Sequence, residues 1–130
     1  MNAEVKTQAQ AQADLVAATA ANLLGTGDRT ALQALAHNAS GSVRGRVLIV
    51  DSRGLVLADS SGPAQLGTSY ASRPEIQTAL GGRQYQVTRG SQTLGREILA
   101  TAVPIVHDAQ TAGAVRITQS IGAVHSAVRR

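Results

Sequence analysis

Two short apolar runs, residues 47–50 and 55–57, flank a turn sequence near the middle of the chain. Asp51 can open that turn by bonding nearby backbone N–H groups, and Gly54 can supply the positive φ that closes it. The pattern therefore predicts a β-hairpin. Because both runs are apolar at odd and even positions alike, both faces of these strands must be covered, which predicts a central place in a sheet.

The first part of the chain predicts two helices that cover one face of this sheet. Residues 3–24 are rich in Ala and Gln, contain no Gly or Pro, and precede Gly25, a helix stop signal. Asp28 is a suitable cap for a second helix over residues 29–38, whose apolar side chains share one face. The Ser-Gly-Ser sequence at residues 40–42 is expected to end it.

The first of these helices carries a repeat of apolar and small residues. Its members follow alternating steps of four and three, the spacing of a coiled-coil seam: Val5, Ala9, Gln12, Val16, Thr19 and Leu23. Several of them are small or polar. The sequence leaves two interpretations open, self-association through this helix or a single half-buried helix.

A short third helix is expected after a loop over residues 60–70. Ser72 and Glu75 have the spacing of a capping box, and Pro74 suits a first helical turn. The residue before a proline disfavours helical geometry, so Arg73 is the alternative cap. In either case free backbone N–H groups and an arginine lie at the start of this helix.

Three further strands are expected over residues 84–89, 96–106 and 112–120, with Pro104 at a bulge or an edge position. A last helix is predicted over residues 121–130. Alternation on the last strand separates two sets of side chains: Val115 and Ile117 on one face, and Ala114, Arg116 and Thr118 on the other. The predicted fold class is α+β, a five-stranded antiparallel sheet with long N-terminal helices on one face and a short helix and loop on the other.

Composition and charge argue against several classes of function. At 130 residues the chain is one domain with room for a single core, and without cysteine it has neither disulfides nor thiolate metal ligands. The net charge of +4 comes from arginines that are scattered singly among few aromatic residues, which argues against nucleic-acid binding. No apolar run reaches the roughly 18 residues of a membrane span.

The sequence does not match the common catalytic and metal-binding motifs. His37, His107 and His125 lack the spacing of paired metal ligands. Residues 67–71, Gly-Thr-Ser-Tyr-Ala, fall one glycine short of a nucleophile elbow. Gly81 and its neighbour follow a helix rather than a strand, so they do not form a phosphate loop. We expect no catalytic residues, no metal and no cofactor in this chain.

A ligand site is expected where the third helix begins. Free N–H groups beside Arg73 favour a carboxylate or a phosphate. Other side chains reach the same space if the strand register permits, and the candidate ligand-binding set is Tyr70, Arg73, Tyr85, Arg89 and Thr101. In the alternative interpretation Arg73 pairs with Glu75 or a carbonyl group, and Arg89 is simply solvated.

Several segments together resemble one family. They are the hairpin run 46–60, Ser-Arg-Pro-Glu-Ile with Ala-Leu-Gly in 72–81, Arg-Gly-Ser through Leu-Gly-Arg-Glu in 89–97, Ala-Val-Pro-Ile at 102–105, and Gly-Ala-Val-Arg-Ile at 113–117. In this order and spacing the chain resembles the extracytoplasmic sensor domain of bacterial two-component histidine kinases, a PAS-like fold of the Cache type. The resemblance covers roughly residues 44–120.

The resemblance implies an organisation and a setting. Residues 1–43 would be a helical segment packed on the sheet, 44–120 the PAS-like sensor core, and 121–130 a helix leading toward a membrane span. The parent protein would be membrane-anchored and dimeric, with this part on the extracytoplasmic face and the kinase in another part. The chain departs from the family at Ala100, where many relatives have an aromatic residue, and in the loop over 60–71, which lacks a polar, histidine-containing segment.

A second resemblance stays open. A roadblock or profilin-like cytoplasmic dimerisation module has a similar hairpin and element order. Such modules usually lack the long leading helix, and they have no counterpart for the Arg-Pro-Glu helix. The expected function is small-ligand sensing, with this module as the alternative and a small enzyme as the third and least supported class.

Overall fold

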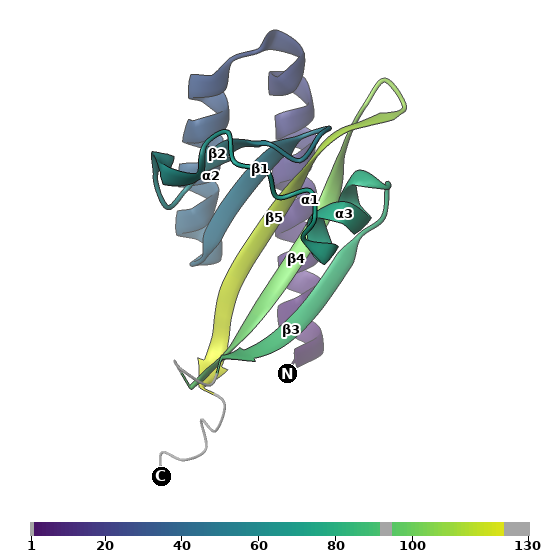
Figure 1. Cartoon of the computed structure of the whole chain (residues 1–130). Coiled ribbons are helices and arrows are strands. Elements are labelled where there is room, and N and C mark those ends of the chain that lie inside the picture. Colours follow the sequence, from purple (N-terminus) through teal and green to yellow (C-terminus); the bar gives the residue numbers. More distant parts are fainter. Residues whose placement is uncertain (1, 92–94, 124–130) are drawn as a thin grey trace.

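The computed structural model describes residues 2–91 and 95–123. Within them, five strands form one antiparallel sheet in the order β2-β1-β5-β4-β3, with α1 and α2 on one face and α3 on the other (Figure 1). The elements are α1 (Asn2–Thr26), α2 (Arg29–Val43), β1 (Arg46–Asp51), β2 (Val56–Asp59), η1 (Pro63–Gln65), α3 (Pro74–Leu80), β3 (Tyr85–Ser91), β4 (Arg96–His107) and β5 (Gln110–Ala123). The predicted fold class is confirmed. No helix in the described part of the chain is long and apolar enough to span a membrane.

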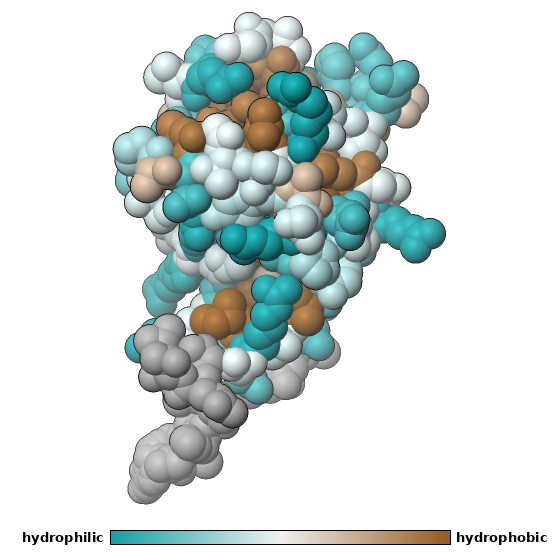
Figure 2. Space-filling view, viewed as in Figure 1, coloured by the Kyte–Doolittle hydropathy of each residue, from teal (hydrophilic) through white to brown (hydrophobic). Residues whose placement is uncertain are grey.

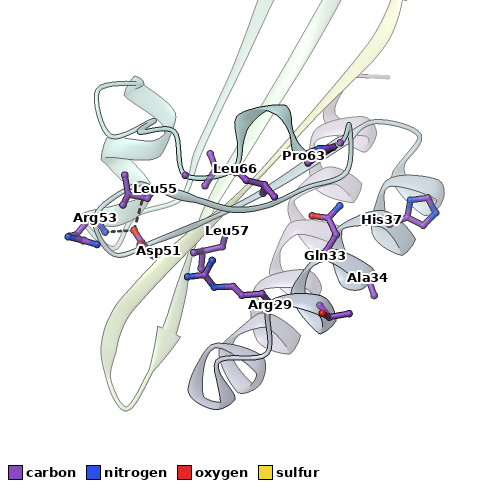
Figure 3. Close-up of a pocket in the computed structure, with 14 residues that line it drawn as sticks. Arg29, Gln33, Ala34, His37, Asp51, Arg53, Leu55, Leu57, Pro63 and Leu66 are labelled. Atoms are coloured by element: carbon purple, nitrogen blue, oxygen red, sulfur yellow. Dashed lines mark hydrogen bonds between the residues drawn. The ribbon is translucent and has the colours of Figure 1, made fainter.

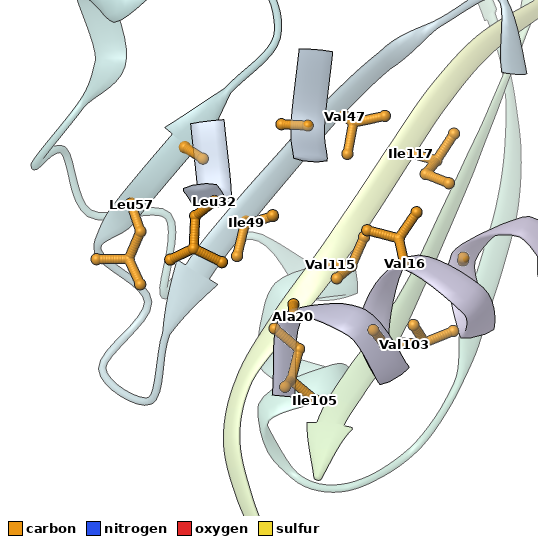
Figure 4. Packing of buried hydrophobic residues seen from close by; sticks show 14 of the residues in the cluster. Val16, Ala20, Leu32, Val47, Ile49, Leu57, Val103, Ile105, Val115 and Ile117 are labelled. Carbon is orange, nitrogen blue, oxygen red and sulfur yellow. The ribbon is translucent and has the colours of Figure 1, made fainter. Parts of the chain in front are cut away.

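The helices α1 and α2 form a continuous core with one sheet face. Val16 and Ala20 of α1 pack with Leu32 of α2 over aliphatic side chains from β1, β4 and β5 (Figure 4). Burying each large aliphatic side chain contributes about 1.5–3 kcal/mol. Two members of the predicted seam, Ala9 and Val16, are buried within the domain. This packing favours the interpretation of a half-buried helix.

The helix α2 begins where the sequence predicted but ends later. Asp28 caps the helix by accepting a hydrogen bond from the backbone N–H of Ala31 at 2.9 Å, as expected. The helix does not end at residues 40–42 but continues to Val43, and Arg44 then takes a left-handed conformation (φ 57°). Val43 is buried in the core. Its packing outweighs the weak helix propensity of the residues before it.

The hairpin forms, but its predicted central position is wrong, because β2 is an edge strand. The four residues of β2 are nevertheless all buried. The segment after η1 covers the outer edge of the hairpin: the Val56 N–H donates to the Thr68 carbonyl at 3.0 Å, and the Tyr70 N–H donates to the Gly54 carbonyl at 2.8 Å. The apolar pattern correctly predicted that both faces of the hairpin are buried. The segment after η1 additionally covers its outer edge.

The strand β5 follows the predicted alternation and runs further than expected. Residues 121–123 belong to it, whereas the sequence predicted the start of a helix there, and the remainder of that helix lies outside the described residues. Pairing with the long β4 extends the strand, with Arg96 opposite Ala123. The division of the chain into 1–43, 44–120 and 121–130 otherwise stays a prediction.

Candidate functional site

The helix α3 lies across β4 and β5 on the face opposite α1 (Figure 1). Arg73 is its N-cap residue, with extended backbone (φ −71°, ψ 133°) and no side-chain cap bond. The alternative prediction for Arg73 is therefore right, and the Ser72–Glu75 capping box is wrong. The helix ends at Leu80 with Gly81 as its C-cap residue, as the sequence indicated.

Glu75 does not cap the helix because its side chain points into the sheet. It is 1% exposed, and its carboxylate lies between two arginines from different strands. Arg89 Nη2 donates to Oε1 at 2.9 Å, and Arg116 Nη1 donates to Oε2 at 3.3 Å. Burial by itself raises the pKa of Glu75, but its own backbone N–H and these two guanidinium groups outweigh burial and hold the pKa below its usual value.

Arg116 is the least exposed of these arginines, at 5%. Its guanidinium lies 5.2 Å from the centre of the Tyr70 ring, and its Nε is buried without a hydrogen-bond partner among the described residues. Burial lowers the pKa of Arg116, while the charge of Glu75 opposes that shift. A buried guanidinium with an unused N–H can donate a further hydrogen bond to an incoming acceptor.

Tyr70 connects this pair to two more arginines. The Arg73 guanidinium lies over its ring at 4.4 Å, a cation–π contact. Arg46 Nη2 donates to the Tyr70 hydroxyl at 3.5 Å and to Asp59 Oδ2 at 2.6 Å. Burial raises the pKa of Asp59, but bonds from Arg46 and Ser61 outweigh it and hold the pKa below its usual value. Asp59 is therefore ionised at neutral pH.

We call Arg46, Arg73, Arg89 and Arg116 the arginine cluster. Three of its guanidinium groups pair with the two buried carboxylates of Asp59 and Glu75, and the fourth, that of Arg73, lies over the Tyr70 ring. The surplus of positive charge makes this face suited to bind an anion. Among the described residues, no group of three His, Asp or Glu side chains could hold a metal ion.

The structure brings four of the five predicted site residues to one face. Tyr70, Arg73 and Arg89 belong to the network around α3, and Tyr85 is on the same face of β3, four residues before Arg89. Thr101 is on the opposite face, where its hydroxyl accepts from Gln86 at 3.0 Å; the same Gln86 amide also bonds α1. The expected placement of Thr101 in the site is wrong because the register of β4 turns it toward α1.

The alternative roles predicted for Arg73 and Arg89 are also wrong. Arg73 stacks on Tyr70 instead of pairing with Glu75, and it is Arg89 that pairs with Glu75. Sequence reasoning did not assign Arg46, Asp59 or Arg116 to the site. The one local signal for Arg116 was its place on a strand face opposite two apolar residues.

The space beneath α3 is filled. Ile76 and Ala79 are fully buried, and they pack with Leu48, Ala102 and Ala114 of the sheet. Three hollows elsewhere in the described part of the chain have other linings. Side chains thus fill the space beneath α3 where the sequence predicted a pocket, and the carboxylate of Glu75 lies there between Arg89 and Arg116.

No family model and no curated protein matches the chain. Solved structures do match. The sensor domain of the E. coli protein DcuS has 20% identity and a TM-score of 0.69, over 88% of this chain and 87% of that one. The V. cholerae histidine kinase DctB sensor domain has 16% identity and a TM-score of 0.64, over 78% of this chain and 41% of that one.

This chain has the fold of these domains, which is PAS-like and of the Cache type. The ligand-binding domain of the Campylobacter jejuni chemoreceptor Tlp3, in complex with 4-methylisoleucine, adds a further match with 14% identity and a TM-score of 0.72, over 90% of this chain and 52% of that one. The chain therefore spans about half the length of the DctB and Tlp3 domains and most of the DcuS domain. The matched structures are sensor domains and a ligand-binding domain. The identities are low, so the likeness establishes the fold and leaves the role of this chain to its own residues.

Proposed function

We propose that this chain is the extracytoplasmic ligand-sensing domain of a membrane-bound two-component sensor histidine kinase, and that it binds a small carboxylate or phosphate at the arginine cluster. The fold is shared with the sensor domain of a histidine kinase and with a chemoreceptor domain solved with an amino-acid ligand. The kinase itself would lie in another part of the parent protein.

One observation carries the proposal: Glu75 occupies the centre of the cluster as a built-in carboxylate. It accepts hydrogen bonds from Arg89 and Arg116, so the position of these two guanidinium groups already suits a carboxylate. The side chain of Arg89 is half exposed, and Arg73 is exposed, so both are within reach of solvent. An incoming anion would bind these two arginines first and compete with Glu75 for Arg116.

The strand β5 offers a physical route from this site to α1. Arg116 faces α3, while its neighbours Val115 and Ile117 pack in the core with Val16 of α1. A ligand that draws Arg116 away from Glu75 would displace β5, and α1 would follow because the core is close-packed. The shift requires that the ligand bind one arrangement more tightly than the other. In the proposed dimer, paired subunits would pass this change on.

Calorimetric titration tests the site. Succinate, citrate and inorganic phosphate are titrated into the wild-type protein and into Arg73→Ala, Arg89→Ala and Arg83→Ala variants. Arg83 is the matched control, since it is exposed just after α3 and has no ion pair among the described residues. We expect saturable binding of at least one anion, weakened by about tenfold or more in the first two variants and unchanged in the control.

Equal binding by all four proteins would remove the arginine cluster as the site. Absence of binding with every anion would refute the anion-sensing role. Circular dichroism spectra of each variant show whether it is folded, so that a loss of binding is not mistaken for unfolding. The gene segments on either side test the wider proposal, which requires hydrophobic spans flanking this part and a kinase core after it.

A further inference from the structure

A second candidate site lies away from the arginine cluster, in a hollow of the described chain. It has a volume of about 760 Å³ and lies between α2, β2 and the loop over residues 62–67 (Figure 3). That size is typical of sites for small organic ligands, which span about 300–1,000 Å³. We call it the α2–β2 groove.

The groove is preformed. Gln33 of α2 joins to the backbone of Asp59: its amide donates to the Asp59 carbonyl at 2.8 Å and its oxygen accepts from the Asp59 N–H at 3.1 Å. The loop is held to β2 by the Gly67 N–H, which donates to the Val56 carbonyl at 2.9 Å. Both walls are thus bonded to the same strand, and a ligand would not have to order them first.

The lining of the groove is mainly apolar. Leu57 of β2 lies along its floor, Ala34 borders it on α2, and Pro63 and Leu66 face it from the loop (Figure 3). Leu66 is 44% exposed. Apolar surface is also visible on the upper part of the molecule, over α2 and the hairpin (Figure 2). Such a lining fits a hydrocarbon chain.

The charge at the groove is cationic. Arg29 reaches from α2 toward Leu57, whereas Arg53 points away from the groove and His37 lies at the far end (Figure 3). Asp51 uses its Oδ1 to accept from the backbone N–H groups of Arg53 and Leu55, both within the hairpin turn. Arg29 has no ion pair with any carboxylate in the described ranges, so its charge is available to a ligand.

We propose that the α2–β2 groove binds an apolar monocarboxylate of medium chain length, with the acid group on Arg29 and the chain over Leu57 and Leu66. This site is separate from the arginine cluster and does not depend on it. A carboxylate fits better than an amine, because Asp51, the acidic residue that lines the groove, already accepts hydrogen bonds from two backbone N–H groups of the hairpin turn. A hydrocarbon chain fits better than a sugar because the floor offers few hydrogen-bonding groups.

Octanoate is the probe. Octanol is the control that lacks the charge, and acetate is the control that lacks the hydrocarbon chain. Calorimetry and backbone amide NMR follow binding to the wild type, Arg29→Gln, Leu66→Ser, and Arg83→Gln as the charge-matched control. We expect octanoate to bind saturably and to shift the amide signals of Ala34, Leu57 and Leu66. Arg29→Gln should weaken octanoate by about tenfold and leave octanol unchanged, while Leu66→Ser should weaken both. Acetate should show no saturable binding in the groove.

Three outcomes would overturn the proposal. The first is that the wild type does not bind octanoate. The second is that Arg29→Gln binds it as well as Arg83→Gln does, or that the amide shifts map to Arg73 and Arg89. The third is that Leu66→Ser converts a dimer into monomers in sedimentation experiments while octanoate does not bind, since the groove would then be a contact between two copies of the chain. Arg73→Ala, which tests the arginine cluster, should leave octanoate binding unchanged.

Discussion

Replacing Glu75 by Gln should destabilise the domain strongly. The change keeps the size of the side chain and removes its charge, leaving Arg116 as a buried cation without a counter-ion. Removing one partner of a buried ion pair typically costs about 3–5 kcal/mol. Arg89, the second partner, is half exposed and can be solvated, so we expect the lower end, about 3 kcal/mol. For a domain of this size that lowers Tm by roughly 10 °C.

Urea unfolding followed by circular dichroism measures this change. Glu4→Gln is the control, because Glu4 is exposed on α1 and has no ion pair in the described part of the chain, and its change should stay within about 0.5 kcal/mol. A second variant, Arg116→Met, and the double variant complete a mutant cycle. In the double variant both buried charges are gone, so it should be more stable than Glu75→Gln alone.

The same variant reports on ligand chemistry. With residue 75 neutral, the half-exposed Arg89 no longer has a carboxylate partner. An added anion then has no competitor for Arg89, so citrate or phosphate should raise the Tm of Glu75→Gln more than that of the wild type. A loss of less than about 1 kcal/mol, or a double variant no more stable than the single one, would refute the view that Glu75 holds Arg116 in place. Equal anion effects on both proteins would refute its role as a stand-in for the ligand.

Two further predictions follow from the packing and the charges. Stability should fall in acid, because the folded-state pKa values of Asp59 and Glu75 lie below their unfolded values. Both ion pairs therefore contribute fully above about pH 5 and lose that contribution as the pH falls through the folded values. Thermal unfolding between pH 7 and pH 2 measures the loss, and a flat Tm over that range would contradict the ion-pair assignments. Gly113→Ala should prevent folding or cost more than about 3 kcal/mol, because the new Cβ would collide with the Val50 carbonyl where β5 pairs with β1, whereas Gly41→Ala, at an open helical position, should be neutral or stabilising in the same urea experiment.

Local features of the chain were predictable because their causes are local. Asp28 caps α2 through its own side chain, Gly54 closes the hairpin turn with a φ of 86°, and proline after Arg73 sets the start of α3. Alternation along β5 correctly separated Arg116 from the apolar residues beside it. Each of these follows from a few neighbouring residues, whatever the rest of the molecule does.

Length and position of elements were less predictable. The helix α2 extends through Gly41 because Val43 packs in the core, and β5 continues to Ala123 because that residue pairs with Arg96 of β4. Tertiary packing overrode weak local preference in both cases. The apolar pattern of a segment shows that it packs against another element, and the tertiary structure sets how many residues of the segment do so.

The site was decided by the tertiary structure. Glu75 and Arg116 are 41 residues apart, and whether they meet depends on the register of β5 and on how α3 lies across it. The same register turns Thr101 toward α1 and away from the arginine cluster. The sequence determined the elements and their apolar faces, since those come from short-range sterics and periodicity. Only the folded chain determined which charges share a space, since that depends on strand order and pairing between distant segments.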